Sequence, residues 1–340
     1  MCGYPRREKE AVRLSRRRFL LLAAGTAVLP AVPRPARAQA YPSRPITMIV
    51  PAPAGGPTDT LARIMAEPLR TALGQPVIIE NVGGAGGSIG VGRAVRAAAD
   101  GYTLSIGNWS THVGASAIYP VQYDVLKDLE PVSLLSFAPL MIVGRPNLPA
   151  TSVAELITWM KASLGKATTG TTGVGSAPHL CSIYFEDKTG TRSQYVPYRG
   201  AAPAVQDLAG GQIDVACLEA STMLPQVRSG KIKGYAVLDQ SRWYKAPELP
   251  TMDEAGAAGL VLSFWHGLWV PKGTPRDVLG RLQAAVIASI AEPAVRARFT
   301  DLGLTMATRV QATPEALAAY HKAETEKWWP IIKAAGITPE

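Results

Sequence analysis

Two glycine-rich turns hold the residues of this sequence that are best suited to bind a small molecule. They cover residues 51–59 and 171–179, and both combine glycines with hydroxyl side chains but contain no Lys or Arg. A helical pattern follows each turn, so the first backbone N–H groups of each helix would be unpaired and partly positive. Such N–H groups can hold a carboxylate without a charged side chain. The alternative interpretation is that both are ordinary tight turns, with Thr58 or Asp59 capping a helix.

A further glycine-rich turn, residues 81–90, raises the alternative of an enzyme. Its end, Gly-Gly-Ser-Ile-Gly at 86–90, matches the G-x-S-x-G pattern around the nucleophile of many serine hydrolases. That chemistry needs the serine on a sharp turn directly after a strand, together with a histidine and an acid. Here seven residues, four of them glycines, separate Ser88 from the strand expected to end at Glu80. We therefore predict that the protein is not an enzyme, and keep an exported hydrolase using Ser88 as an alternative.

The sequence does not predict nucleotide or metal binding. No turn has the G-x-G-x-x-G register, because Pro178 stands where the last glycine after Gly173 and Gly175 should be, and none ends in Gly-Lys-Ser/Thr. The four histidines and three cysteines lack the H-x-x-x-H and C-x-x-C spacings of metal sites. We therefore expect no cofactor and no metal ion.

The basic charge of the chain belongs to its first forty residues. Residues 1–40 contain nine Lys or Arg and two acids, so they supply +7 of the formal net charge of +9 and leave +2 for the rest. We therefore expect no nucleic-acid partner, which would require a basic stripe on the folded domain. A basic region, an apolar run over 19–32 and small-residue cleavage patterns at 36–40 predict a cleaved signal peptide over 1–40 and a soluble, periplasmic mature protein. The Ser-Arg-Arg-Arg-Phe-Leu stretch at 15–20 indicates the twin-arginine type; a Sec-type signal and an uncleaved anchor are the alternatives.

Apolar runs and helical patterns alternate along the remaining residues, which predicts an α/β fold with parallel sheets and helices on both faces. Proline-flanked stretches at 137–149 and 264–275 are suited to cross between domains. A chain that leaves one domain, builds a second and returns forms two lobes joined by two hinge strands, with a ligand cleft between them. We expect one lobe over 41–142 and 268–340 and the other over 143–267. Strands are expected at 46–50, 77–80, 102–106, 132–143, 166–169, 193–196, 213–218, 233–238 and 268–270, and helices at 58–73, 91–99, 153–164, 178–189, 202–209, 223–229, 275–291, 293–302 and 314–335.

Cys181 and Cys217 are the only thiols beyond residue 40. In an oxidising compartment they can form a disulfide. Their spacing in the sequence does not give their distance, so a disulfide and two buried free thiols both stay open.

Several short segments occur in a fixed order along the chain. They are Tyr-Pro-Ser-Arg-Pro-Ile at 41–46 followed by the turn at 51–59, Val-Ile-Ile-Glu-Asn at 77–81, Ala-Asp-Gly-Tyr-Thr-Leu at 99–104, Val-Pro-Tyr-Arg-Gly-Ala-Ala-Pro-Ala at 196–204, Leu-Ala-Gly-Gly-Gln-Ile-Asp at 208–214 and Pro-Lys-Gly-Thr-Pro at 271–275. In these segments the sequence resembles the Bug-type periplasmic receptors of tripartite tricarboxylate transporters. The resemblance implies a type II periplasmic-binding-protein fold, a small mono- or dicarboxylate ligand, and a monomeric receptor that serves integral-membrane transporter subunits. An orphan binding protein that serves a signalling partner would share this fold.

The resemblance also implies a carboxylate site shared by both lobes, with some contacts made through ordered water. The residues it assigns are Ala54, Gly55, Gly56, Thr58, Asn108 and Thr111 from one lobe, and Gly175, Ser176, Ala177 and His179 from the other.

Two positions depart from the family pattern. Residues 216–222 read Ala-Cys-Leu-Glu-Ala-Ser-Thr where a hydrophobic-Asp-Asn run is common, and Pro53 stands where alanine is more usual. If Glu219 faces the cleft, it would repel a second ligand carboxylate or accept a hydrogen bond from a ligand amine or hydroxyl. The alternative is that Glu219 pairs with a surface cation. The identity of the carboxylate is therefore left open.

Overall fold

Ten strands of the described chain, residues 41–337 of this computed structural model, form one mixed sheet. The strand order is β2-β1-β3-β9-β4-β7-β5-β6, and both β8 and β10 pair with β4. The signal peptide expected over residues 1–40 lies outside the described residues.

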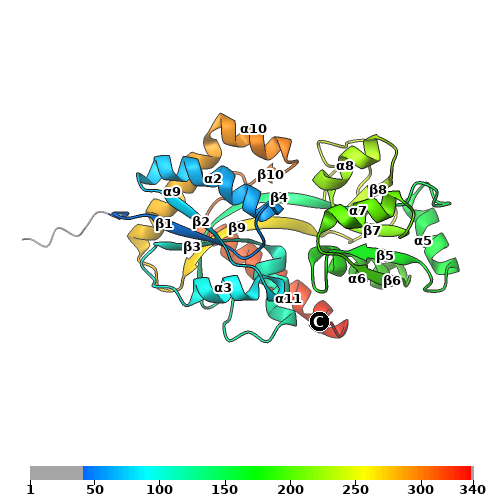
Figure 1. Ribbon diagram of the computed structural model, residues 1–340, viewed down its shortest axis with the longest axis horizontal. Helices are drawn as coiled ribbons and strands as arrows, with labels where there is room; N and C mark the ends of the chain where they lie inside the picture. The colour runs from blue at the N-terminus through cyan, green and yellow to red at the C-terminus, as the bar shows by residue number, and fades with distance from the viewer. Residues whose placement is uncertain (1–40, 338–340) are drawn as a thin grey trace, which may run out of the picture. The chain divides into compact units, whose positions relative to one another are not determined.

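The first lobe contains three parallel strands and the return strand β9. β1 (Ile46–Val50) lies between β2 (Val77–Asn81) and β3 (Thr103–Asn108), and all three are parallel. β9 (Ser263–Pro271) pairs antiparallel with β3, and the short β10 (Thr305–Met306) pairs with β4. The helices of this lobe are α2 (Pro57–Leu73), α3 (Ser88–Val95), α4 (Ala115–Ile118), α9 (Arg276–Ala291), α10 (Pro293–Asp301) and α11 (Pro314–Ala334), with the short helical turns η1 (Ala85–Gly87) and η2 (Ser110–Gly114) (Figure 1).

The second lobe repeats the same plan with shorter strands. β5 (Thr168–Thr171) lies between β6 (Gln194–Pro197) and β7 (Val215–Glu219), and these three strands are parallel. β8 (Lys233–Val237) pairs antiparallel with β4. The helices of this lobe, mostly green in Figure 1, are α5 (Val153–Ala162), α6 (Ala177–Thr189), α7 (Ala201–Ala209) and α8 (Ala220–Arg228).

Two long strands connect the lobes and run antiparallel to their neighbours. The first part of β4 (Leu129–Gly144) pairs with β9, and its last five residues pair with β7 and β8. The α/β prediction is confirmed, but the expectation of parallel sheets is wrong for β4, β8 and β9, which pair antiparallel. The chain enters the second lobe through β4 and returns through β9, so the two strands lie side by side in opposite directions. β9 is also longer than the expected 268–270, because His266 and Gly267 interrupt its apolar pattern although both pair within the sheet.

Proline and glycine set the ends of the helices that follow the two predicted turns. α2 begins with Pro57, whose missing N–H would have no partner there, and Gly74 ends it in a left-handed conformation at φ 73°. α6 begins after Ser176, whose hydroxyl accepts a hydrogen bond from a backbone N–H of the first turn, and Gly190 ends it at φ 65°. These local features made both helices predictable to within one residue at their starts.

Buried indole rings form the centre of the first lobe's core. Trp109, Trp265, Trp269 and Trp328 each expose 1% or less of their surface. Trp109 packs edge-on against Trp328 of α11, with ring centroids 5.3 Å apart, which fixes the segment after β3 against the last helix. A separate apolar cluster around Met141 of β4 supports the second lobe.

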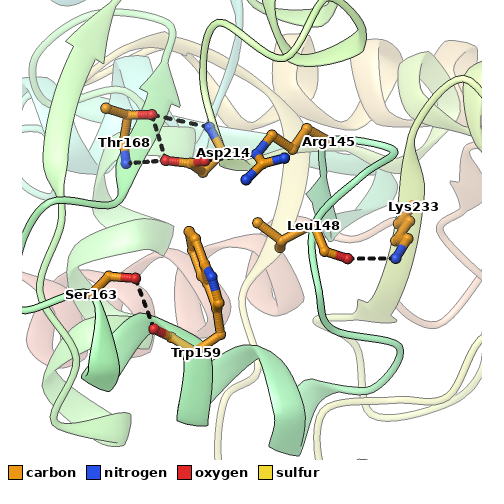
Figure 2. Close-up of polar contacts among 7 residues, drawn as sticks. All are labelled: Arg145, Leu148, Trp159, Ser163, Thr168, Asp214 and Lys233. Carbon is orange, nitrogen blue, oxygen red and sulfur yellow. Dashed lines mark hydrogen bonds and ion pairs between the residues drawn. The ribbon is translucent and has the colours of Figure 1, made fainter.

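Asp214 is the last residue of the segment Leu-Ala-Gly-Gly-Gln-Ile-Asp at 208–214, and it has a structural role in the second lobe. Its Oδ2 accepts hydrogen bonds from the N–H and the hydroxyl of Thr168, both at 2.9 Å, at the start of β5 (Figure 2). Arg145 Nε, just beyond β4, donates to Asp214 Oδ1 at 2.8 Å. Asp214 directly precedes β7, so these contacts connect the start of β7 to the start of β5 and to the end of β4. Glu219 lies at the other end of β7.

Within residues 41–337, no single helix is both long enough and apolar enough to cross a membrane. α9 and α10 meet those two criteria only when taken together, as a pair bent by 71°.

Candidate ligand-binding cleft

A buried carboxylate holds the turn between β1 and α2. Asp59 is 2% exposed, and its carboxylate accepts hydrogen bonds from Gly55 N (2.8 Å) and Asn81 Nδ2 (3.0 Å). Arg63 Nε donates to the same carboxylate at 2.9 Å. Burial would raise the pKa of Asp59, but these hydrogen bonds, that of Arg63 foremost, hold it below its usual value. Asp59 is therefore ionised, fixes the turn, and already uses the Gly55 N–H.

The Thr58 hydroxyl is oriented by a chain of hydrogen bonds from the end of β3. Asn108 Nδ2 donates to Thr58 Oγ1 at 2.7 Å, and Asn108 Oδ1 accepts from Thr111 N at 3.1 Å. The second contact fixes which end of the Asn108 amide faces Thr58. Because Thr58 Oγ1 already accepts a hydrogen bond, its own proton is left to be donated. Thr58 is thus a fixed, neutral donor at the first turn of α2.

His179 holds the turn between β5 and α6 through hydrogen bonds to Gly175 and Ser176. Ser176 Oγ accepts from His179 N at 3.3 Å and donates to Gly173 O at 2.7 Å. The His179 ring uses Nδ1 to accept from Gly175 N at 3.1 Å, and burial lowers the pKa of the ring. Gly175 adopts φ +74°, in the left-handed region that favours glycine. The neutral His179 ring therefore fixes the turn.

Ser110 connects the two lobes directly. Its Oγ accepts a hydrogen bond at 3.2 Å from the N–H of Ala177, the first residue of α6. Ser110 lies in η2, a π-helical turn that directly follows β3 and Trp109. This segment, together with α4, was not expected from the sequence, because it has no clear apolar periodicity.

Two adjoining cavities open between the lobes. The larger, about 430 Å³ and here called the loop cavity, is lined by the glycine turns and by Thr111 and Tyr119. The smaller, about 210 Å³ and here called the helix cavity, is lined by helix starts and by the apolar side chains Leu140, Leu218 and Phe264. The two cavities share the side chains of Ser110, Thr172 and Ser176.

The N-termini of four helices meet at the helix cavity. Its lining includes residues from the starts of α2, α6, α7 and α8, namely Pro57 and Thr58, Ser176 and Pro178, Gly200 and Ala201, and Glu219 and Thr222. Each helix start carries the partly positive end of the helix dipole. At α6, however, the N–H groups of Ala177 and His179 already donate to Ser110 and Ser176. Neither cavity has a Lys or Arg among the described residues that line it. The arrangement can therefore stabilise a carboxylate through backbone dipoles and hydroxyl groups alone.

Glu219 is an acidic group in this otherwise neutral lining. It is the last residue of β7 and directly precedes α8. Burial raises the pKa of the Glu219 carboxyl, and a hydrogen bond from Ser221 Oγ to Glu219 Oε1 at 3.1 Å acts against this. The sequence allowed an ion pair with a surface cation instead. No ion pair among residues 41–337 includes Glu219, so that alternative is not supported.

Cys181 of α6 and Cys217 of β7 form a disulfide, with Cα atoms 6.2 Å apart. The sequence left this pairing open. The bond joins the helix that follows the Ser176 turn to the strand that ends at Glu219, so it fixes two parts of the cleft wall relative to each other.

The residues assigned to the site from the sequence fall into two groups. Those that line the cavities are Thr58, Thr111, Gly175, Ser176 and Glu219. Those outside both linings are Ala54, Gly55, Gly56, Asn108, Ala177 and His179. Asn108, Ala177 and His179 instead hold the lining residues through the hydrogen bonds described above. His179 faces a separate surface cavity beside Arg192 and Tyr195.

Several lining residues were missing from the sequence-based assignment. They include Ser110, Thr172, Tyr119, Phe264 and the α7 start at Gly200 and Ala201. The hydroxyl of Thr172 and the glycine before the expected helix at 202–209 were recognisable features. The tertiary proximity of Tyr119 and Phe264 was not, because each comes from an element far along the chain from the turns.

In the part of the chain that the structure describes, no histidine is hydrogen-bonded to Ser88. Ser88 begins α3 beyond the end of β2 and η1, and it is 8% exposed. Both ring nitrogens of His112 contact Ser105 and Thr111, and one ring nitrogen of each other histidine contacts Gly175 (His179), Ser136 (His266) or the His112 carbonyl (His321). Among the residues described here, no cluster of His, Cys, Asp or Glu is placed to hold a metal ion.

A two-lobed α/β fold with a cleft lined by helix N-termini defines a solute-binding protein. The family model described as tripartite tricarboxylate transporter family receptor matches residues 61–337. The chain belongs to this receptor family, which confirms the resemblance and the fold that it implied.

Individual relatives agree with this assignment. A protein of Agrobacterium vitis from the TAR-I ttuE-ttuC′ intergenic region is 39% identical over 337 residues, which cover 98% of this chain and 95% of that one. The solved structure of the periplasmic binding protein BugD is 38% identical with a TM-score of 0.77, covering 88% of this chain and 100% of that one. MatC of Rhodopseudomonas palustris, solved with bound malate, is 34% identical with a TM-score of 0.77, covering 86% and 100%.

Proposed function

We propose that this protein is a receptor that binds a small organic mono- or dicarboxylate in the cleft and delivers it to integral-membrane transporter subunits. The observation that carries the proposal is the convergence of four helix N-termini on the helix cavity, where the described lining has no Lys or Arg. Dipoles and hydroxyls stabilise one carboxylate group. They bind it less strongly than a bidentate arginine would, which suits a ligand that must be released.

The family relationship supports the remaining parts of the proposal. MatC, a relative, was solved with malate, a carboxylate. BugD is named a periplasmic binding protein, and we propose that this chain also acts in the periplasm after cleavage of a twin-arginine signal peptide over 1–40. Residues 41–142 with 268–340, and 143–267, would be the lobes of a monomer that closes by a hinge motion at β4 and β9. The protein would be a receptor without catalytic activity.

Calorimetric titration of the mature protein with linear mono- and dicarboxylates of three to six carbons tests the ligand class. We expect at least one acid to bind and to raise the unfolding temperature, because a ligand that binds only the folded state stabilises it. Ser176→Val should abolish this binding. Ser152→Val is the matched control, since Ser152 caps α5 in the same way, accepting from Glu155 N at 3.2 Å, but lies outside both cavities.

Two results would contradict the proposal. One is binding of neutral sugars, with no response to any carboxylate. The other is equal loss of affinity in Ser176→Val and Ser152→Val, which would place the site elsewhere. An esterase activity that disappears in Ser88→Ala would favour the enzyme alternative instead.

A further inference from the structure

Glu219 is the one charged residue among the described residues that line the loop cavity or the helix cavity. It stands at the end of β7, paired across the sheet with Leu140 of β4. Leu140, Leu218 and Phe264 make this part of the helix cavity apolar. The Glu219 carboxylate therefore lies in the same small cavity as the groups proposed to hold the ligand, and its neighbours in the lining include these three apolar side chains.

Glu219 has no counter-charge among residues 41–337. Within the described part of the chain, its hydrogen-bonding side-chain partner is Ser221, two residues along, and it takes part in no ion pair. Arg199 precedes the lining residue Gly200, but its side chain is exposed and lies outside the lining. Glu219 is half-buried, and a half-buried carboxylate without a counter-charge is less favourable than one exposed to water. A cationic ligand group would remove this penalty when it binds.

A second carboxylate on the ligand would be repelled by Glu219. Glu219 already places a negative group at the start of α8, so it uses the favourable field of that helix itself. Another anion beside it would be repelled at close range in a site of low dielectric. An ammonium group at the same position would be attracted and could donate up to three hydrogen bonds.

We propose that Glu219 is a specificity residue, which selects carboxylates that also carry an ammonium group over dicarboxylates of the same length. The ligand carboxylate is held by the Thr58 hydroxyl and by the helix N-termini, and its ammonium group pairs with Glu219. This inference rests on the proposed function, because it needs a carboxylate in the cleft.

A series of acids of equal length tests the inference on the wild-type protein. At each length from three to six carbons, the ω-amino acid is compared by calorimetry with the parent monocarboxylate and with the dicarboxylate, and the α-amino acid is added to cover a short spacing. We expect an aminocarboxylate to bind at least about tenfold more tightly than the monocarboxylate of the same length, and the dicarboxylate to bind more weakly than either. A dicarboxylate that binds more tightly than every aminocarboxylate would overturn the proposal.

The variant Glu219→Gln keeps the size of the side chain and removes its charge, so it tests whether the charge determines selectivity. It should lose about tenfold or more in affinity for the preferred aminocarboxylate, keep its affinity for the monocarboxylate, and gain affinity for the dicarboxylate. Glu248→Gln is the matched control, because Glu248 is exposed and lines neither cavity. Unchanged selectivity in Glu219→Gln would also overturn the inference.

The outcomes distinguish this inference from the proposed function. If no acid of any kind binds, the receptor proposal itself fails. If monocarboxylates bind and Ser176→Val abolishes that binding, while the ω-substituent and Glu219→Gln make no difference, only the role of Glu219 fails. Circular dichroism and unfolding temperature confirm that each variant is folded before its affinity is interpreted. If Glu219→Gln does not fold, the wild-type series decides the question.

Discussion

At the scale of single residues, the cleft is lined mainly by neutral groups that other side chains hold in position. Asn108 orients Thr58, and His179 fixes Gly175. Neither supporting side chain lines the loop cavity or the helix cavity. A carboxylate bound here would therefore meet groups whose orientation is set before it arrives, which limits the entropy lost on binding.

The Thr58 hydroxyl should contribute directly to affinity. We expect Thr58→Val, which keeps the shape but removes the proton donor, to weaken carboxylate binding by about tenfold to a hundredfold, since a hydrogen bond to a charged group contributes about 1.5–3 kcal/mol. Thr58→Ser should retain most of the affinity, and Thr71→Val, at an exposed position of the same helix, should not change it. Calorimetry provides the measurement. Equal affinities for Thr58→Val and the wild type would exclude Thr58 from the site.

Gly175 should not tolerate a side chain. A Cβ at this position would lie 2.1 Å from Ile118 Cδ1, and its φ of +74° is unfavourable for any other residue. We expect Gly175→Ala to destabilise the protein by about 1–3 kcal/mol and to lose ligand binding, as overpacked positions do. Gly190→Ala at the other end of α6 is the control, because its φ is +65° but its Cβ would meet nothing closer than 3.9 Å. If both variants kept full affinity, the turn would not be a binding element.

At the scale of elements, the cleft walls are the carboxyl ends of parallel strands and the helices that follow them. β5, β6 and β7 are parallel neighbours, so their ends lie at one edge of the sheet and lead into α6, α7 and α8. β1 leads into α2 in the same way from the first lobe. The disulfide between Cys181 and Cys217 then joins α6 to β7 within this wall.

Removal of that disulfide should destabilise the folded protein. Closing a loop of 36 residues is expected to contribute about 3–4 kcal/mol by restricting the unfolded chain. Urea unfolding with and without a reductant should show a loss of that order for the wild type. The double variant Cys181→Ala/Cys217→Ala should unfold at a lower urea concentration and should not respond to reductant. A wild type whose unfolding is unaffected by reductant would show that the bond adds nothing to stability.

At the scale of the whole molecule, buried neutral histidines tie stability to pH. Burial lowers the pKa of His266 and of His321 to about 4, and it lowers that of His112 well below the usual value, with His321 adding to the effect. The unfolded chain takes up protons near pH 6.5, where the folded chain does not. The stability they provide is therefore complete above pH 6.5 and is lost as the pH falls toward 4.

Each histidine should add up to about 1.4 kcal/mol per pH unit to this loss. Burial also raises the pKa of some carboxyl groups, such as Glu186, and these groups make the protein more stable as the pH falls toward 4.5. The test therefore compares the pH dependence of the free energy of unfolding between the variant and the wild type. The free energy of unfolding, measured between pH 6.5 and 5, should depend less steeply on pH in His266→Gln than in the wild type, by about one proton. Identical slopes would show that His266 is not held neutral in the folded protein.

The sequence by itself determined most of the elements and the family. Local features, such as a proline at a helix start or a glycine after a helix, act within a few residues, so the helices around both turns were predicted closely. Ordered segments along the chain were enough to identify the receptor family. The two turns were also predicted to be anion sites, because unpaired helix N–H groups are expected from the strand-turn-helix order.

Only the tertiary structure decided which residues share the cleft. β4 and β9 became antiparallel neighbours through pairings between residues more than a hundred positions apart, and no local pattern encodes such a pairing. The same long-range order placed the starts of α7 and α8 beside those of α2 and α6. Side-chain contacts within the turns, from Asp59 to Gly55 and from His179 to Gly175, took up two backbone N–H groups that the sequence left free. The long-range order also left Glu219 in the helix cavity without a cation among the described residues. A sequence shows which groups can bind, but distances between them depend on how the strands are ordered in the sheet.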